Sequence, residues 1–323
     1  MYTALADISI DTGSSRPTMR TILTDRSIET GSSHLLCEDY ALVGEVKPSD
    51  EYRVIYACVS DGCSSAPNAD LRARFLCHNF ATLVKTQIST PQNAQQLWPH
   101  LPGLLLQNHL VYTNMLGVSS DCMYATFWGI ILFIPTDNTA GIDRYFVCGY
   151  GDGAFIETDI NGKCYVYLKE YPSGAPYYPI YHIDPKRDKA YRNKFSDKVM
   201  FKKYEIDPET GECELIYSGE DSVSTPFVWV DGVKVHPVDV PSFSSMSLFS
   251  DGVHSFQGRE LADMTDLDKL TWFCKNYMTF PVQTSNFMTR NCRFMASESR
   301  RTKTVHTDDL GCASIMLKYS EGE

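Results

Sequence analysis

The chain has 323 residues, of which 43% are hydrophobic and 12% aromatic. This apolar content excludes a disordered chain, and the length suffices for one large domain or two domains of ordinary size. The net charge of −11 and the isoelectric point near 5.2 argue against general binding to nucleic acids or anionic membranes, whereas the excess carboxylates can concentrate divalent cations.

Cysteine usage and hydropathy predict a soluble cytoplasmic protein. The eleven cysteines are an odd number, form no CxxC pair and have no regular spacing, which is typical of reduced and mostly buried thiols. The segment Met1 to Asp11 lacks the basic and apolar regions of a leader. The longest apolar run, Phe127–Pro135, is too short to cross a bilayer.

The first part of the chain predicts an extension followed by strands. Residues 1–17 are polar and turn-rich, and we expect one domain over residues 18–323. Apolar β-formers then predict a pair of strands and a third strand. These strands are expected at Met19–Leu23, Tyr40–Glu45 and Val54–Ser60.

Two helical stretches follow. The first is expected to be capped by Asn68 or Asp70, because the apolar residues after this point recur at spacings of three and four. The second, Gln92–Met115, contains Pro99 and Pro102, which we expect to break it into pieces.

The second half predicts strands, two helices and a last strand. The strands are expected at Met123–Ile134, Arg144–Val147, Cys164–Leu168 after an Asn161-Gly162 hairpin turn, and Gly311–Lys318. The helices are expected at Glu260–Tyr277 and Val282–Ala296. This order fits a layered α+β domain better than alternating βαβ units.

One segment, Tyr171–Tyr204, differs in composition from the rest. It begins with a run of tyrosines and prolines, and its Lys186–Lys203 part has eight Lys or Arg residues against two Asp. We interpret residues 171–204 as a basic, aromatic-rich insertion, either a solvated face or an ordered flap. Docking of a phosphorylated or nucleic-acid partner is the alternative.

Carboxylates stand at the ends of three strand-like runs. The three sites are Asp61-Gly62 after Val54–Ser60, Asp152-Gly153 after Tyr145–Gly151, and Asp251-Gly252 after Met246–Ser250. A buried strand exposes its end, and glycine leaves room beside the carboxylate, so each aspartate is expected at a rim. A further pair, Asp308 and Asp309, precedes the last strand.

An Asp-Gly pair is also a common hairpin turn. Asp231-Gly232 has this interpretation, because alternating runs flank it at Pro226–Val230 and Val233–Val235. By contrast, helices follow Gly62 and Gly252, which favours a metal site there. Oxygen ligands suit Mg²⁺ or Mn²⁺, and a two-metal centre can hydrolyse a phosphoester without a nucleophilic cysteine. No cysteine here begins the Cys-x₅-Arg loop of a thiol phosphatase.

Six segments in this order resemble the metal-dependent PPM-type phosphatases, also called protein phosphatase 2C-like. They are Cys37-Glu38-Asp39, Val59-Ser60-Asp61-Gly62, Tyr124-Ala125-Thr126, Gly151-Asp152-Gly153, Leu248-Phe249-Ser250-Asp251-Gly252, and Asp308-Asp309-Leu310-Gly311-Cys312-Ala313. The resemblance implies a four-layer αββα sandwich, in which helix pairs flank two mostly antiparallel sheets and the metals lie at one edge.

The resemblance also implies a set of metal ligands. Asp61 matches the aspartate that bridges both metals, and the Gly62 carbonyl matches a further ligand. Asp251 and Asp308 match the remaining ligands of one metal. Asp309, the next residue, is the alternative to Asp308, and Asp308 is favoured.

Further roles follow from the same resemblance. Glu38 and Asp39 match residues that hold metal-bound waters, and Asp152 matches a ligand of a weaker third metal. The chain departs from the family at Cys63, where many members have a histidine proposed as general acid, so the acid is unassigned. It also departs at His34, where an arginine often binds the phosphate; a protonated histidine can hydrogen-bond phosphate, and a structural role is the alternative.

The resemblance thus implies a protein serine/threonine phosphatase that needs two or three Mg²⁺ or Mn²⁺ ions and uses two of them to activate a bridging hydroxide. A phosphorylated protein is the expected partner, and the oligomeric state is left open. One alternative is a pseudophosphatase that keeps the fold as a binding or regulatory module, with Cys63 and His34 as its signs. The other is a hydrolase of nucleotides or other small phosphoesters.

Overall fold

The computed structural model describes residues 19–66, 68–107, 111, 115–118, 124–136, 144–231, 243–258, 261–280 and 284–319. The predicted extension at 1–17 and the second arm of the Asp231-Gly232 hairpin lie outside the described residues. The expectations for these two segments therefore stay predictions.

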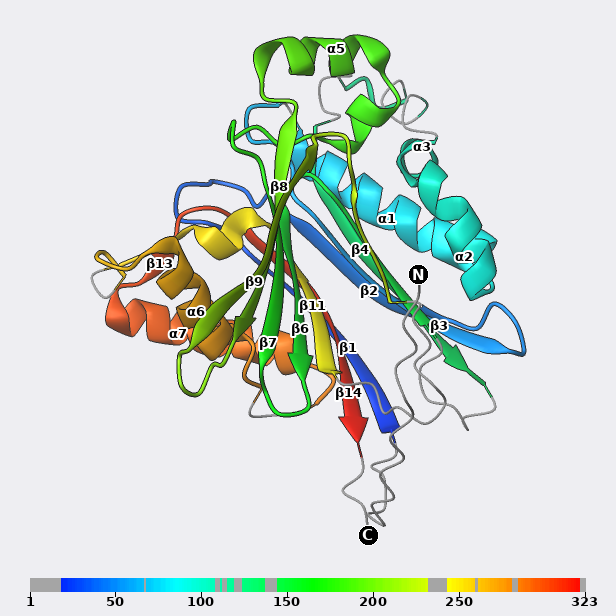
Figure 1. The fold of residues 1–323 in the computed structure, drawn as a ribbon. Coiled ribbons are helices and arrows are strands. Elements are labelled where there is room, and N and C mark those ends of the chain that lie inside the picture. Colours follow the sequence, from blue (N-terminus) through cyan, green and yellow to red (C-terminus); the bar gives the residue numbers. More distant parts are fainter. Residues whose placement is uncertain are drawn as a thin grey trace, which may run out of the picture.

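Two antiparallel sheets form the centre of the molecule (Figure 1). The seven-stranded sheet has the order β1-β14-β11-β6-β7-β8-β9 and the five-stranded sheet the order β10-β5-β4-β3-β2. The strands of the first are β1 (Met19–Glu29), β6 (Gly153–Asp159), β7 (Cys164–Glu170), β8 (Lys198–Ile206), β9 (Cys213–Ser222), β11 (Phe243–Phe249) and β14 (Leu310–Tyr319). The strands of the second are β2 (Tyr40–Val46), β3 (Tyr52–Ser60), β4 (Phe127–Pro135), β5 (Arg144–Tyr150) and β10 (Phe227–Asp231). A short ribbon pairs β12 (Phe256–Gln257) with β13 (Val305–His306).

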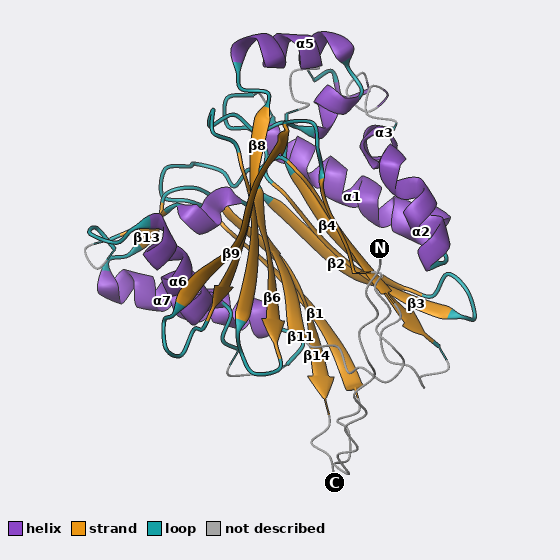
Figure 2. Ribbon diagram, in the orientation of Figure 1, coloured by secondary structure: helices purple, strands orange, loops and turns teal. Residues whose placement is uncertain are grey.

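Helices cover the outer face of each sheet (Figure 2). The five-stranded sheet packs against α1 (Ala69–Gln87), α2 (Pro91–Leu97), the 3₁₀ turn η1 (Trp98–His100) and α3 (Leu101–Leu106). The seven-stranded sheet packs against α6 (Asp266–Tyr277), α7 (Phe287–Thr302) and the 3₁₀ turn η4 (Asp251–His254).

The residues of β4 show how the layers are built. Its alternate side chains point to opposite faces, as in any strand. Trp128, Ile130 and Leu132 belong to the core between the two sheets, whereas Ile131 and Phe133 pack beneath the helices. Apolar side chains on both faces require a layer on each side, and the predicted αββα sandwich is confirmed.

Most predicted elements are present, with local differences. The predicted breaks at Pro99 and Pro102 are confirmed, because each proline begins a new helical piece, in η1 and α3. Asn68 is the N-cap residue of α1, but it is in the left-handed conformation (φ 57°) and its side chain makes no capping hydrogen bond.

The two predicted N-terminal strands form, but they lie in different sheets. Strand β1 pairs with β14 in the seven-stranded sheet, and β2 pairs with β3 in the five-stranded sheet. The predicted Asn161-Gly162 turn is confirmed as the connection of β6 to β7, with Gly162 at φ 89°.

The segment predicted as a basic insertion divides into two parts. Residues 171–197, which we call the cap, hold the 3₁₀ turn η3 (Pro179–His182) and helix α5 (Pro185–Lys194) above one end of the sheets (Figure 1). The remaining residues, 198–204, belong to strand β8. Within the cap, the Tyr177 hydroxyl donates to Asp188 (2.6 Å) and the Tyr191 hydroxyl to the Ala175 carbonyl (2.5 Å), so the cap is an ordered unit.

Two further observations concern thiols and membranes. The ten cysteines among the described residues are free thiols, and most are buried. In the described part of the chain, no helix is both long and apolar enough to span a membrane.

Candidate functional site

The ends of three strands bring the predicted aspartates to one end of the sandwich. Asp61 follows β3 and Asp152 follows β5, both in the five-stranded sheet, whereas Asp251 follows β11 in the seven-stranded sheet. The site therefore draws on both sheets.

The backbone of Asp61 is fixed by the neighbouring chain segment. The Thr126 hydroxyl accepts a hydrogen bond from the Asp61 N–H (3.0 Å), and the Thr126 N–H donates to the Asp61 carbonyl (2.8 Å). Gly62 forms a bridge with Ala125, and a Cβ atom on Gly62 would lie 2.4 Å from the Ala69 carbonyl oxygen. Only glycine permits this close approach to the start of α1.

A cavity of about 290 Å³ connects several of these carboxylates. Asp152, Asp251 and Asp308 line it together, although they are far apart in the sequence. Lys169, from strand β7, and Tyr171 line the same cavity.

The carboxylates strongly perturb one another. Burial and the negative charges of Asp39 and Asp251 raise the pKa of Asp61 well above its usual range. Burial, followed by the charges of Asp152 and Asp308, does the same to the pKa of Asp251. The negative charges of these carboxylates repel one another, and bound cations would relieve that repulsion. The cluster is therefore suited to cations.

The Asp39 carboxylate lies against that of Asp61, and burial raises its pKa. One of its oxygens accepts hydrogen bonds from the Ser250 hydroxyl (2.6 Å) and the Gly311 N–H (2.5 Å). Ser250 directly precedes Asp251, so Asp39 links the ends of β3, β11 and β14 at the site.

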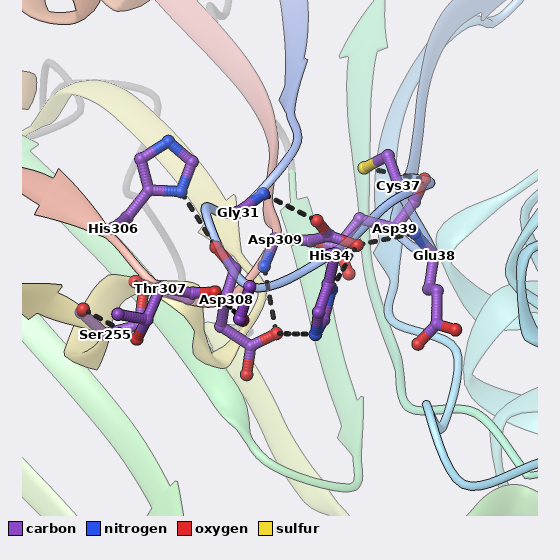
Figure 3. Close-up of polar contacts among 12 residues, drawn as sticks. Gly31, His34, Cys37, Glu38, Asp39, Ser255, His306, Thr307, Asp308 and Asp309 are labelled. Carbon is purple, nitrogen blue, oxygen red and sulfur yellow. Dashed lines mark hydrogen bonds and ion pairs between the residues drawn. The ribbon is translucent and has the colours of Figure 1, made fainter.

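Asp308 and Asp309 have opposite orientations (Figure 3). The Asp309 carboxylate is 1% exposed and accepts hydrogen bonds from the backbone N–H groups of Gly31 (2.7 Å) and Glu38 (2.6 Å). Asp308 is 43% exposed and lines the cavity. Of the two, only Asp308 lines the cavity with Asp152 and Asp251, where the three could face the same bound cation.

His34 lies between these two acids (Figure 3). Its Nδ1 is 3.0 Å from an Asp309 carboxylate oxygen, and its Nε2 is 3.6 Å from one of Asp308. The close contact with Asp309 raises the pKa of His34, with added contributions from the charges of both aspartates. The imidazole is thus already paired within the protein.

Glu38 is held by its backbone, whose N–H donates to Asp309. Its side chain extends away from Asp309 (Figure 3), and burial raises its pKa. One carboxylate oxygen is buried without a hydrogen-bond partner. Glu38 is therefore beside the Asp308–Asp309 turn, but it is not among the residues that line the cavity.

The donor set fits hard cations. Carboxylate and carbonyl oxygens are the usual ligands of Mg²⁺ and Mn²⁺, and Asp39 and Asp152 each have one buried oxygen without a hydrogen-bond partner. Across the described ranges, no three His, Cys, Asp or Glu side chains approach closely enough to enclose a metal ion. The aspartates are therefore neighbours, two of them with carboxylate oxygens that accept no hydrogen bond, but they do not yet surround a common point as metal ligands would.

Sequence reasoning missed Lys169. This lysine is 2% exposed, burial lowers its pKa to about 7, and the charge of Asp152 acts in the opposite direction. Burial raises the pKa of Asp152 to about 7, and Lys169 counteracts that shift. The sequence did contain one indication of its place. Alternate residues of a strand share a face, so Lys169 lies on the same face of β7 as Tyr165 and Tyr167, toward the second sheet.

No family model matches the sequence, and no curated protein matches it either. Bacterial serine and serine/threonine phosphatases are among the solved structures that align with the chain. Stp1 from Staphylococcus aureus aligns over 95% of this chain and 99% of its own, with 8% identity and a TM-score of 0.48. The S. agalactiae serine/threonine phosphatase aligns over 92% and 100%, with 10% identity and a TM-score of 0.46. The phosphatase domain of SpoIIE from Bacillus subtilis aligns over 95% and 96%, with 11% identity and a TM-score of 0.41. At this level of similarity, no residue role is carried over to this chain from these proteins.

Proposed function

We propose that the chain is a PPM-type phosphatase that removes phosphate from phosphoserine or phosphothreonine in proteins and depends on Mg²⁺ or Mn²⁺. The observation that carries this proposal is the convergence of Asp61, Asp152, Asp251 and Asp308 from distant parts of the chain. The charges of these side chains act on one another, and three of them share a cavity. A structural role alone does not account for buried carboxylates whose like charges act on one another, because their repulsion disfavours the fold.

The proposed ligands are the side chains of Asp61, Asp251 and Asp308 and the carbonyl oxygen of Gly62. When bound, two Mg²⁺ or Mn²⁺ ions would supply positive charge that lowers the pKa of water and neutralises the phosphoryl oxygens. Asp309 is assigned to loop structure, because backbone N–H groups occupy its carboxylate.

The other residues position these ligands. Thr126 fixes the backbone of Asp61, and Asp39 connects Asp61 to Ser250 and Gly311. His34 is proposed to orient the Asp308 carboxylate while it is held by its ion pair with Asp309, rather than to bind phosphate directly. Glu38 and Asp39 are also proposed to hold ordered water at the rim of the site.

Phosphopeptide hydrolysis tests the proposal. The full chain should release phosphate from phosphoserine and phosphothreonine peptides with Mn²⁺ or Mg²⁺, and should lose this activity in EDTA. Asp61→Asn should lower kcat at least about a hundredfold, because it removes the negative charge that the two ions would share. Asp50→Asn, on a fully exposed side chain paired with Lys47, is the matched control and should change nothing. Activity that survives EDTA and Asp61→Asn would refute the proposal.

A binding module without strong catalysis is the second candidate. The observation that favours it is that, within the described segments, no metal-ligating group of three side chains is formed. Calorimetric titration with Mn²⁺ separates the two candidates, because a pure binding module need not bind the ion. Comparing rates on phosphopeptides and nucleotides decides whether proteins or small phosphoesters are the substrates.

A further inference from the structure

Lys169 occupies an unusual place for a lysine. It lies in strand β7, is 2% exposed, and pairs in register with Gly153, the residue that follows Asp152. Its side chain lines the cavity that Asp152 and Asp251 also line. Lysine is almost never buried to this extent without compensation, because removing an ammonium group from water is costly.

The compensation comes from aromatic rings and from the charge of Asp152. The ammonium nitrogen lies 5.3 Å from the ring centre of Tyr171 and 5.8 Å from that of Phe201, both within cation–π range. Among the described residues, no carboxylate is within ion-pair distance of Lys169, and the charge that acts on it is that of Asp152. Lys169 therefore brings an ammonium group into the acidic cavity, and the charge of Asp152 favours the protonated form.

We propose that the ammonium group of Lys169 takes the place of a metal ion at Asp152, so that this centre holds two ions and not three. This inference rests on the proposed function. A divalent ion at the free oxygen of Asp152 would face the positive charge of Lys169, and like charges disfavour one another most where water is excluded. Asp61, Asp251 and Asp308 then remain for the two ions, while Asp152 serves as the counter-charge of Lys169.

Counting bound ions tests the inference directly, without an activity measurement. Equilibrium dialysis and calorimetry with Mn²⁺ give the number of ions per chain for the wild type and for Lys169→Gln. We expect two ions in the wild type and a third, weaker ion in Lys169→Gln. Lys198→Gln, which removes a surface lysine paired with Glu220, is the matched control and should bind two.

The extra ion must depend on Asp152. Lys169→Gln combined with Asp152→Asn should return to two ions, and Asp152→Asn alone should keep two, because in the wild type this carboxylate holds no metal. Lys169→Met provides a second replacement of similar length, and circular dichroism with urea unfolding confirms that each variant is folded.

The possible failures are distinguishable. Two ions in both Lys169→Gln and Lys169→Met would overturn the inference and leave the proposed function intact. Three ions in the wild type, or the loss of an ion in Lys169→Gln, would also overturn it, the latter because Lys169 would then be a ligand. A wild-type chain that binds no Mn²⁺ would defeat the proposed function itself.

Discussion

Two adjacent aspartates at the site have different physical roles. Asp309 is 1% exposed and accepts hydrogen bonds from two backbone N–H groups, so its charge holds the Gly31–Glu38 loop against the start of β14. Asp308 is 43% exposed and lines the cavity. A single position in the chain thus separates a loop anchor from a proposed ligand.

Replacing each of these aspartates by asparagine should separate stability from activity. Asp309→Asn should lower the free energy of unfolding by about 2–3 kcal/mol, because charge-assisted hydrogen bonds to buried donors are weakened. Asp308→Asn should cost less than about 0.5 kcal/mol, as expected for a partly exposed residue, but should abolish most metal-dependent turnover. Urea unfolding in EDTA and phosphopeptide assays measure the two effects. The reverse pattern would assign the ligand role to Asp309.

Glycine at position 31 should be equally sensitive. A Cβ atom there would lie 2.3 Å from the backbone carbonyl carbon of Asp308, so Gly31→Ala must displace the turn that carries the proposed ligand. We expect a loss of about 1–3 kcal/mol in unfolding free energy and a weaker affinity for Mn²⁺. Gly103→Ala is the control, since its Cβ would meet nothing closer than 4.0 Å within helix α3. Equal Mn²⁺ affinity in Gly31→Ala and the wild type would contradict the close packing.

At the residue scale, the sequence predicted the acidic cluster better than its surroundings. The Asp-Gly pairs at Asp61, Asp152 and Asp251 were visible because each follows an apolar strand. The choice between Asp308 and Asp309 depends on which carboxylate the backbone of a distant loop occupies, and local sequence does not contain this information. Lys169 was missed because one lysine in an apolar strand forms no motif. Its partner Asp152 comes just before Gly153, which lies opposite Lys169 where β6 pairs with β7.

At the scale of elements, the cap contains a buried titratable group. His182 is edge-on to the rings of Tyr150 (5.2 Å between ring centres) and Tyr177 (5.0 Å). Burial lowers the pKa of His182 from 6.5 to about 4. The charged groups that act on it are Lys169, Asp188 and Arg192.

The pKa of His182 predicts that the cap weakens in acid. A histidine whose pKa is depressed in the folded state contributes its full stability above the unfolded pKa of 6.5 and loses it as the pH falls toward 4. Between pH 7 and about pH 5, the wild type should lose about 1–2 kcal/mol more than His182→Phe, whose ring carries no proton to gain. Urea unfolding measured at both pH values gives this difference. Parallel pH dependence in the two proteins would show that His182 is not buried in its neutral form.

Element boundaries were predictable where the cause is local. Pro99 and Pro102 divided the helical stretch, each at the start of a new piece, and Asn161-Gly162 formed a hairpin turn. Each effect depends on a few neighbouring residues. Strand partners were not predictable in the same way. Strand β1 pairs with β14, nearly the whole chain away. The end of the predicted insertion proved to be strand β8, which pairs with β7 on one side and with β9 on the other.

At the scale of the whole molecule, metal binding should be coupled to folding. The proposed ligands come from both sheets, so a cation bound between them favours the closed sandwich over the unfolded chain. Mn²⁺ at about one hundred times its dissociation constant should stabilise the wild type by about 2.7 kcal/mol per site. In Asp251→Asn this stabilisation should largely disappear, which urea unfolding with Mn²⁺ and with EDTA measures. An equal gain in both proteins would place the bound ion elsewhere.

The central claim is that carboxylates from the two sheets enclose a pair of divalent ions, and anomalous diffraction from crystals soaked in Mn²⁺ tests it most directly. The account predicts two anomalous peaks between Asp61 and Asp251, with the Asp308 side chain beside one of them and no peak at Asp152 next to Lys169. A map with no peak between Asp61 and Asp251, and with their oxygens turned away from each other at saturating Mn²⁺, would contradict it.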